Sequence, residues 1–295
     1  MKLTNYLNVA KAARPKTLPA AVIPVVLGCL LAYQLTEEFH ISLALCTLLG
    51  AIFIQIATNF FNDAIDAQKG ADTEKRLGPQ RVTASGLMSK KTVYLYAISC
   101  LILASIFGGI LAIERGWVIL LIGIPSLYLS YGYTGGPFPL AYRGMGEIFV
   151  ILFFGWIATV GTVFVQTGEF HLESLLLGTQ LGLLSAILIL VNNIRDRDED
   201  RQSQKNTIVV KLGVSPALLI LLFMTLGCYL AGLLWTHFGY SKAAYLPTIS
   251  SILGLSIFLG VSKLVKYNET AYNKYLGLAA LQLVSFAILW AYSLY

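Results

Sequence analysis

Charged residues are scarce in this sequence. Asp, Glu, Lys and Arg make up only 12% of its 295 residues, while 57% are hydrophobic. A soluble domain carries about 25% charged residues, so the composition excludes an ordinary soluble protein and predicts an integral membrane protein. The apolar runs also lack the alternating pattern of membrane-spanning strands, so we expect helices.

Nine apolar runs are long enough to cross a bilayer, for which about 20 residues are needed. They cover residues 18–36, 41–62, 92–113, 116–133, 146–167, 172–193, 215–236, 243–262 and 275–294. We therefore predict an all-α membrane protein, a bundle of nine transmembrane helices forming one domain over residues 1–295. The first run exceeds the 7–15 apolar residues of a signal peptide, so we expect it to be retained as a helix.

The positions of Lys and Arg predict the orientation of the bundle. With nine helices and a cytoplasmic N-terminus, only Arg115 and Lys242 lie outside, which leaves 19 of the 21 basic residues inside. This agrees with the positive-inside rule and places the C-terminus outside. The net charge of +6 thus follows from membrane topology, and we expect no nucleic-acid partner. The sequence also gives no sign of an obligate protein partner.

Cysteine and histidine are too few and too dispersed to form the site. The four cysteines lie in separate apolar segments without a C-x-x-C pair, so we expect ordinary buried or lipid-facing thiols and no disulfide. All three histidines map to the external side: His40, His171 and His237. This argues against a histidine base or metal ligand at the cytoplasmic face, where the long polar loops lie.

Two polar clusters at the ends of apolar runs carry the strongest functional signal. They begin at Asn59 and Asn192, about 130 residues apart. A carboxylate near the bilayer centre costs roughly 2.5–3.5 kcal/mol on insertion scales, so acids in such positions need a partner. This concentration of acids and amides suggests a polyanion, such as a diphosphate, held by a divalent metal.

Within each cluster, helical geometry selects which side chains share a face. At 100° per residue, the shared faces contain Asn59, Asn62, Asp63 and Asp66 in the first cluster, and Asn192, Asp196 and Asp200 in the second. We expect the four aspartates to bind Mg²⁺, which prefers hard oxygen ligands, with the asparagines behind them. Asp72, in the following loop, is a further candidate ligand. The alternative is that the acids mark solvated helix ends paired with nearby Lys and Arg, an interpretation we favour for Asp198.

Cations and aromatic residues surround these clusters. Arg76 and Arg81 follow the first cluster, and Arg14 precedes the first long apolar run. Such cations bind diphosphate oxygens and stabilise a departing group, although each also serves as a topology determinant. Several tyrosines gather around Gly135-Gly136-Pro137, namely Tyr128, Tyr131, Tyr133 and Tyr142. They either belong to the interfacial aromatic belt or stabilise a carbocation through cation–π attraction.

The arrangement of these segments resembles the UbiA superfamily of intramembrane aromatic prenyltransferases. The resemblance covers nearly the whole chain and rests on an Asn-Asp-x-x-Asp cluster after the second helix and Asp-x-x-x-Asp after the sixth. The naphthoate branch of menaquinone synthesis is the most similar. That similarity is carried by residues 14–20, residues 69–72 running into residues 77–81, the Tyr133–Pro137 turn and residues 192–196.

This resemblance implies a helical bundle around a cavity open to the cytoplasm and sideways to lipid, in the cell inner membrane. It implies that Mg²⁺ at Asp63, Asp66, Asp196 and Asp200 bridges to an isoprenyl diphosphate, which Arg76, Arg81 and Lys205 contact. Many members place a third acid four residues after the second, where this chain has Gly70, and Asp72 lies six away.

The implied reaction transfers a polyprenyl group to 1,4-dihydroxy-2-naphthoate, with loss of diphosphate and CO₂, towards demethylmenaquinone. Glu147 either assists proton removal or is a buried structural acid. Two alternatives remain at this point. One is another aromatic acceptor, such as 4-hydroxybenzoate, homogentisate, a chlorin or a differently carboxylated naphthoate. The other is a transporter, whose acids would lie deep in several helices with access from both faces.

Overall fold

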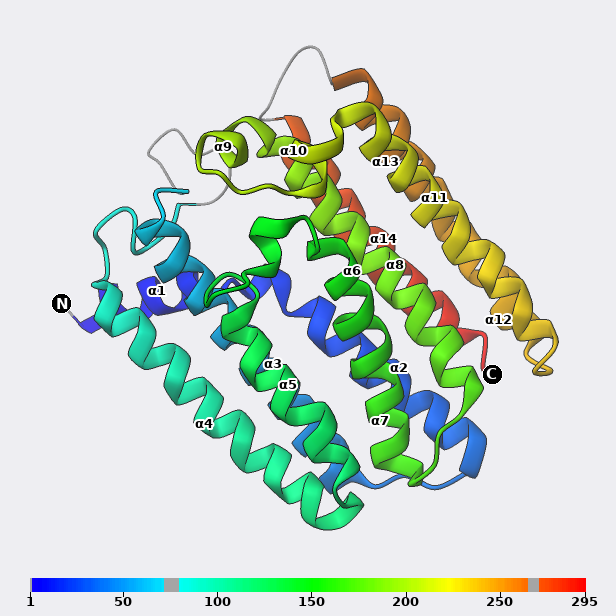
Figure 1. The fold of residues 1–295 in the computed structure, drawn as a ribbon. Coiled ribbons are helices and arrows are strands. Elements are labelled where there is room, and N and C mark those ends of the chain that lie inside the picture. The colour runs from blue at the N-terminus through cyan, green and yellow to red at the C-terminus, as the bar shows by residue number, and fades with distance from the viewer. Residues whose placement is uncertain (1, 72–79, 265–270) are drawn as a thin grey trace.

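The computed structural model describes residues 2–71, 80–264 and 271–295. These residues form helices and connecting loops, and the described part of the chain contains no strand. Asp72 and Arg76, predicted above as a metal ligand and a diphosphate contact, lie outside the described residues. Figure 1 shows a bundle of long, roughly aligned helices with several short helices at one end.

Eight helical segments in the described ranges are long and apolar enough to cross a membrane. They are α2 (Pro19–Thr36), α3 (Ile41–Gln68), α4 (Lys90–Arg115), Gly146–Thr167, α8 (Leu172–Arg195), Val214–Thr236, Ser241–Leu264 and α14 (Tyr272–Tyr292). They form because continuous apolar runs must satisfy their backbone groups internally when water is absent. The prediction of a multi-pass all-α membrane protein is confirmed.

One of the nine predicted crossings, residues 116–133, is not among these eight segments. It corresponds to α5 (Val118–Gly132), which has 15 residues. This is shorter than the about 20 residues that a bilayer crossing needs. The nine-helix count therefore stays a prediction, although an apolar helix is present in the expected segment.

Three of the eight segments are composite. Gly146–Thr167 consists of α6 (Gly146–Val150), a π-helix (Ile151–Ile157) and α7 (Ala158–Thr167). Val214–Thr236 contains α11 (Val214–Gly232) and ends in a 3₁₀ turn. Ser241–Leu264 contains α12 (Ser241–Tyr245), a 3₁₀ turn and α13 (Ser251–Leu264).

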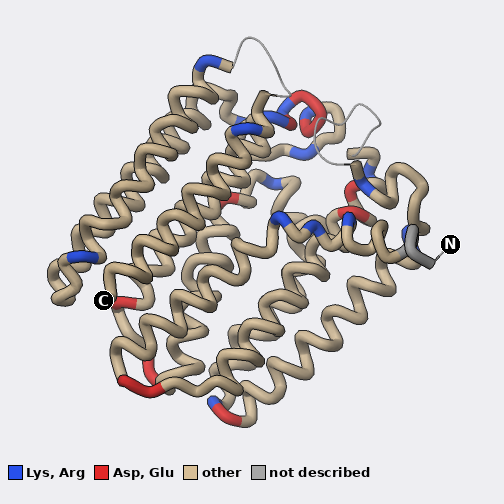
Figure 2. Tube along the Cα trace, turned by 180° about the vertical axis from the view of Figure 1, so that it is seen from behind, with Lys and Arg blue, Asp and Glu red and all other residues tan. Residues whose placement is uncertain are grey.

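Short helices gather at the end of the bundle where the two acidic clusters lie. They are α1 (Lys2–Ala13), α9 (Arg197–Gln202) and α10 (Ile208–Leu212). Figure 2 shows most Lys and Arg at this end and few at the opposite end. The charge asymmetry read from the sequence thus corresponds to a real asymmetry of the folded bundle.

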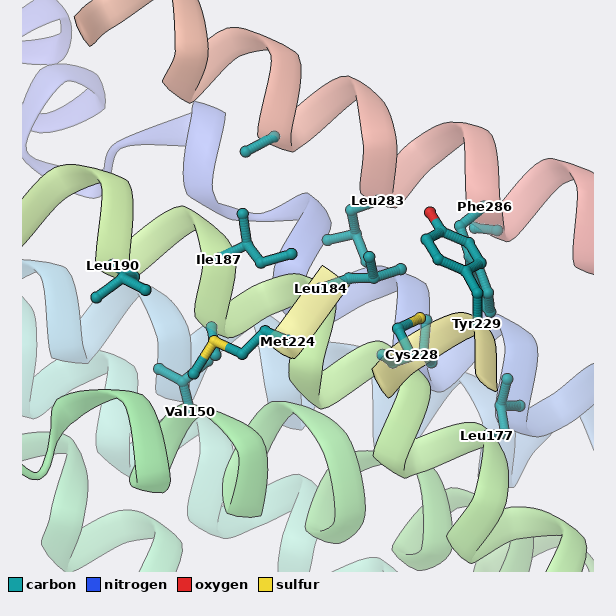
Figure 3. Close-up of a cluster of buried hydrophobic side chains, with 14 of the residues drawn as sticks. Val150, Leu177, Leu184, Ile187, Leu190, Met224, Cys228, Tyr229, Leu283 and Phe286 are labelled. Carbon is teal, nitrogen blue, oxygen red and sulfur yellow. The ribbon is translucent and has the colours of Figure 1, made fainter. Parts of the chain in front are cut away.

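The helix α8 is the centre of the larger hydrophobic core. Its side chains face α11 and α14, as Figure 3 shows for Leu184 and Ile187 beside Met224, Cys228 and Leu283. A smaller core cluster joins α3 and α4 and includes Phe60, Phe61 and Val93. The two acidic clusters therefore extend from helices that pack in different cores, and the space between those helices is where a cavity can form.

Close packing of glycines joins the π-helix to α8. A Cβ atom on Gly155 would lie 2.4 Å from the carbonyl oxygen of Gly178 and 2.8 Å from Cα of Gly182. Small residues of this kind let membrane helices approach at backbone distance. The contact fixes the segment that carries Glu147 against the helix that carries Asn192 and Asn193.

Candidate active site between the two acidic clusters

A cavity of about 1410 Å³ lies between α3 and α8. Its polar wall includes Arg14, Asn59, Asn62, Asp63, Asp66, Arg81, Tyr133, Glu147, Asn192, Asn193, Arg195 and Lys205. Its apolar wall includes Ile54, Ala104, Gly108, Ile122, Leu127, Phe153, Ile157 and Leu188. The volume exceeds the range of about 300–1,000 Å³ usual for small-molecule sites. A space that is polar in one part and apolar in another suits an amphiphile with an anionic head and a hydrocarbon chain.

In the first cluster, Asp63 holds the loop that follows α3. Its Oδ2 accepts a hydrogen bond from the backbone N–H of Val82 at 3.2 Å, and its Oδ1 accepts one from Thr83 at 2.9 Å. The carboxyl is only 1% exposed. This contact places the neighbouring Arg81 on the cavity wall, so Asp63 positions a cation as well as presenting an acid.

Asp66 is bound to Tyr142, which lies in the 3₁₀ turn Leu140–Arg143. The Tyr142 hydroxyl donates to Asp66 Oδ1 at 2.8 Å. Lys69 Nζ lies 3.8 Å from the centroid of the Tyr142 ring and donates to the carbonyl oxygen of Thr134 at 2.9 Å. Burial, together with the Asp66 charge and hydrogen bond, raises the pKa of the Tyr142 phenol. Tyr142 therefore stays a hydrogen-bond donor to Asp66 at neutral pH.

In the second cluster, Arg195 covers Asp196 with two hydrogen bonds, from Nε to Oδ1 at 2.6 Å and from a terminal nitrogen to Oδ2 at 2.8 Å. The same guanidinium donates to Asn192 Oδ1 and to Asn273 Oδ1, each at 2.8 Å. Asn192 Nδ2 in turn donates to Asp196 Oδ2 at 3.2 Å. All these groups line or adjoin the cavity, and Arg195, which the sequence analysis assigned only to topology, is their centre.

Asp200 faces the first cluster across Tyr142. Lys205 Nζ lies 3.6 Å from Asp200 Oδ1 and 5.9 Å from the Tyr142 ring centroid. Burial raises the pKa of the Asp200 carboxyl to about 6, an effect that Lys205 opposes and that the charges of Asp196 and Asp66 increase. The charge of Asp66, on α3, thus acts on Asp200, on α9.

The hydrogen bonds of these acids show whether carboxylate oxygens remain for a divalent metal. Asp200 Oδ2 is buried and has no hydrogen-bond partner among the described residues, which leaves one hard oxygen for a cation. Asp66 uses one oxygen for Tyr142. Carboxylate oxygens that leave room for substrate phosphates are the ligands Mg²⁺ prefers, so the residues fit. No group of three or more His, Cys, Asp or Glu in the described ranges is already gathered at metal-binding spacing.

Asn59 holds a turn of the N-terminal segment. Its Nδ2 donates to the carbonyl oxygen of Ala13 at 2.8 Å and to Thr17 Oγ1 at 2.9 Å. Between those two residues Arg14 adopts a left-handed conformation (φ 51°, ψ 69°), and it lies on the cavity wall. Asn62 Oδ1 accepts a hydrogen bond from the hydroxyl of Thr134. The asparagines of the first cluster thus organise the cavity wall.

The predicted aromatic group separates into different environments. Tyr133 lines the cavity, and burial, followed by the charges of Glu147, Asp66 and Asp200, raises the pKa of its phenol. Tyr131 packs edge-on against Phe61, with ring centroids 5.4 Å apart, and supports α3 from behind. Tyr128 is 57% exposed, as expected for an interfacial belt.

Four further residues remain: Asp198, which the sequence analysis interpreted as a solvated helix-end acid, and three residues to which it assigned no function. Asp198 is 53% exposed at its side chain and pairs with Arg197 at 3.6 Å, outside the buried cluster. Lys69, Thr134 and Asn193 were not assigned functions, yet each holds a cavity-wall residue in place. For Asn193 the signal was its position beside Asn192, whereas no local pattern reveals the distant partners of Lys69 and Thr134.

Comparison with known proteins supports this assembly. The model of the UbiA prenyltransferase family matches residues 21–286. The 1,4-dihydroxy-2-naphthoate octaprenyltransferase of Escherichia coli K12 is 36% identical over 211 residues, which cover 69% of this chain and 68% of that protein. The Haemophilus influenzae protein of the same name is 31% identical over 264 residues, covering 86% of this chain and 85% of that protein.

A solved structure has the same fold. The structure of a UbiA homolog from Archaeoglobus fulgidus bound to GPP and Mg²⁺ superimposes with a TM-score of 0.64 at 15% identity, covering 96% of this chain and 99% of that chain. The match over nearly the full length agrees with the family model. This chain therefore belongs to the UbiA prenyltransferase family.

Proposed function

We propose that this protein is a Mg²⁺-dependent prenyltransferase that moves a polyprenyl group from its diphosphate to 1,4-dihydroxy-2-naphthoate. The observation that carries the proposal is the cavity, where Asp63, Asp66 and several cations meet a long apolar wall. Asp196 and Asp200 adjoin it through Arg195 and Lys205, which line it. The names of the relatives from Escherichia coli and Haemophilus influenzae support the naphthoate as acceptor. Family membership disfavours the transporter alternative.

The diphosphate is bound at the polar part of the cavity. Arg14, Arg81 and Lys205 supply positive charge there, and cations fixed in a low-dielectric site stabilise charge that develops on a leaving group. Asp66 and Asp200 would hold Mg²⁺, with Asp63 and Asp196 beside them. When bound, the ion supplies further charge stabilisation for the departing diphosphate.

The apolar wall receives the prenyl chain and excludes water from the reacting carbon. Phe153, Ile157 and Leu188 belong to this wall. A dry cavity matters because water would otherwise capture the allylic cation. The electron-rich ring then attacks the first prenyl carbon, the carboxyl group leaves as CO₂, and the product is the prenylated quinol, the reduced form of demethylmenaquinone.

The charge distribution supports an orientation. Lys and Arg concentrate at the end that carries α9 and α10 (Figure 2), which the positive-inside rule assigns to the cytoplasm. We therefore propose an inner-membrane protein whose cavity takes both substrates at the cytoplasmic side, with the N-terminus inside and the C-terminus outside.

Radiolabelled polyprenyl diphosphate tests the proposal with purified protein in lipid nanodiscs. The naphthoate and 4-hydroxybenzoate are offered separately, with Mg²⁺ or with EDTA. We expect Mg²⁺-dependent transfer to the naphthoate alone, lost in Asp66→Asn and Asp200→Asn and retained in the exposed control Asp198→Asn. Transfer to 4-hydroxybenzoate instead would show that the proposed acceptor is wrong. Transfer that persists in EDTA would show that the reaction does not depend on Mg²⁺.

A further inference from the structure

Glu147 is a buried acid that the metal and diphosphate interactions do not use. It lies in the first turn of α6, is 2% exposed and contributes to the cavity wall. Its Oε1 accepts a hydrogen bond from Asn193 Nδ2 at 2.8 Å. Its Oε2 is buried without a hydrogen-bond partner among the residues that the structure describes. A buried polar atom of this kind calls for an explanation.

The surroundings of Glu147 argue against a purely structural acid. Burying a carboxylate is costly unless a cation or several donors compensate it. None of the ion pairs recorded for the described residues involves Glu147, and its neighbour Asn193 is neutral. The Oε2 atom therefore lacks a compensating donor among the described residues.

An O–H group would satisfy this oxygen, whereas an anion would not. A diphosphate would be repelled by Glu147, whereas a phenolic hydroxyl both donates a hydrogen bond and can yield a proton. Tyr133 lies close by, since its hydroxyl is 3.0 Å from where a Cβ on Gly146 would be. The charges of Glu147, Asp66 and Asp200 all act on Tyr133.

We propose that Glu147 is the catalytic base that takes the proton of a ring hydroxyl on the aromatic acceptor, with Asn193 holding its carboxylate in position. This inference rests on the proposed function and deepens it, because it assigns the acceptor side of the same cavity. The required ligand chemistry is a phenol with its hydroxyl next to the carbon that is prenylated.

The proposed step conserves atoms and charge. The C1–O bond of the prenyl diphosphate breaks, and its electron pair leaves with the diphosphate. The ring carbon that bears the carboxylate forms a bond to C1 of the prenyl group while Glu147 takes the proton of the adjacent hydroxyl. This leaves a β-keto carboxylate. Loss of CO₂ places the electron pair on the ring oxygen, which recovers the proton from Glu147, and the product is a prenylated quinol.

The decisive variant is Glu147→Gln. Glutamine has nearly the same shape and keeps an oxygen for Asn193, but it cannot take the proton. General-base catalysis contributes about 10²–10⁴-fold, so we expect kcat for transfer to fall at least about 100-fold. The KM for the prenyl diphosphate should stay within about threefold, as should the Kd of the naphthoate measured by equilibrium dialysis.

A second readout separates a base from a structural residue. The readout is slow hydrolysis of prenyl diphosphate to prenyl alcohol, measured over long incubations with Mg²⁺ and without acceptor, because this step would break the same C1–O bond without the acceptor hydroxyl. Glu147→Gln should hydrolyse at the wild-type rate. Glu147→Asp, which keeps a carboxylate, should transfer at least about tenfold faster than Glu147→Gln. Glu169→Gln is the matched control, because this glutamate is exposed between α7 and α8 and does not belong to the cavity wall.

Three results would overturn the inference while leaving the proposed function intact. They are transfer by Glu147→Gln within about threefold of wild type, parallel loss of hydrolysis and transfer, and a Glu147→Asp variant no faster than Glu147→Gln. If wild-type protein instead fails to prenylate the naphthoate at all, the proposed function itself fails, so the two failures are distinguishable.

Discussion

Arg195 and Asp196 are consecutive in sequence, yet their side chains form a buried pair with two hydrogen bonds, at 2.6 Å and 2.8 Å. If Asp196 binds Mg²⁺, at least one of its oxygens has to give up its hydrogen bond to Arg195. Arg195→Leu removes the pair and leaves the carboxylate unpaired, which costs about 3–5 kcal/mol when a buried partner is lost. We expect a large drop in thermal stability in EDTA and a larger recovery with Mg²⁺ than wild type shows.

The same thermal unfolding measurement, made in detergent, tests whether Asp196 is a metal ligand. Arg201→Leu is a suitable control, since this neighbouring arginine is exposed on α9. If Mg²⁺ shifts the Tm of Arg195→Leu and wild type equally, then Asp196 is not a ligand and serves only to hold Arg195.

The contact of Asp63 with the backbone of Val82 and Thr83 gives a second prediction. In Asp63→Asn the amide nitrogen cannot accept a hydrogen bond, so one buried N–H loses its partner at a cost of about 1–3 kcal/mol. We expect faster amide hydrogen exchange over residues 81–86, measured by mass spectrometry without metal. Unchanged exchange there would mean that Asp63 acts on metal alone.

The hydrogen bond between Tyr142 and Asp66 gives a third prediction. Tyr142→Phe keeps the ring beside Lys69 and removes only the hydroxyl. Hydrogen bonds to charged groups contribute about 1.5–3 kcal/mol, so kcat/KM should fall roughly 10- to 100-fold. Tyr128→Phe is the control, because that tyrosine is 57% exposed and should keep wild-type activity. Equal activity of the two variants would contradict a function for the Tyr142 hydroxyl.

The contact of Gly155 with Gly178 and Gly182 gives a prediction about stability. A methyl group at Gly155 meets backbone atoms at 2.4 Å and 2.8 Å, and overpacking a tight contact costs about 1–3 kcal/mol. Gly155→Ala should therefore lower the Tm. Gly227→Ala, whose Cβ would be 3.8 Å from a Leu183 methyl, should not. A Tm unchanged by Gly155→Ala would show that the two segments separate without penalty.

The sequence predicted the long helices well because membrane insertion imposes a strong requirement on length and polarity. Helical periodicity placed Asn192, Asp196 and Asp200 on one helix face, but α8 ends at Arg195 and α9 begins at Arg197, so Asp200 lies on a separate short helix. The exposed Asp198 followed from the same geometry. The chain's membership of the UbiA family confirmed the resemblance drawn from residues 59–66 and 192–200.

Contacts between distant segments could not be predicted in this way. Asp63 binds backbone groups 19 and 20 residues away, and Tyr142 binds Asp66 across 76 residues. These pairings depend on how loops return to the helix ends, which no local period encodes. Helix α1 was missed because it is short and mixes polar with apolar residues, and the π-helix because its composition is that of an ordinary apolar helix.

The π-helix Ile151–Ile157 determines which side chains of the segment Gly146–Thr167 face the cavity. Val150, Phe154, Ala158 and Thr162 all line the cavity at four-residue intervals, although an α-helix drifts by about 40° over four residues. The wider turn offsets this drift and keeps one face directed inward along the whole segment. Deleting a single residue from it would change the direction of Glu147 relative to α7. The number of residues in this segment is therefore as much a part of the reaction site as their identities.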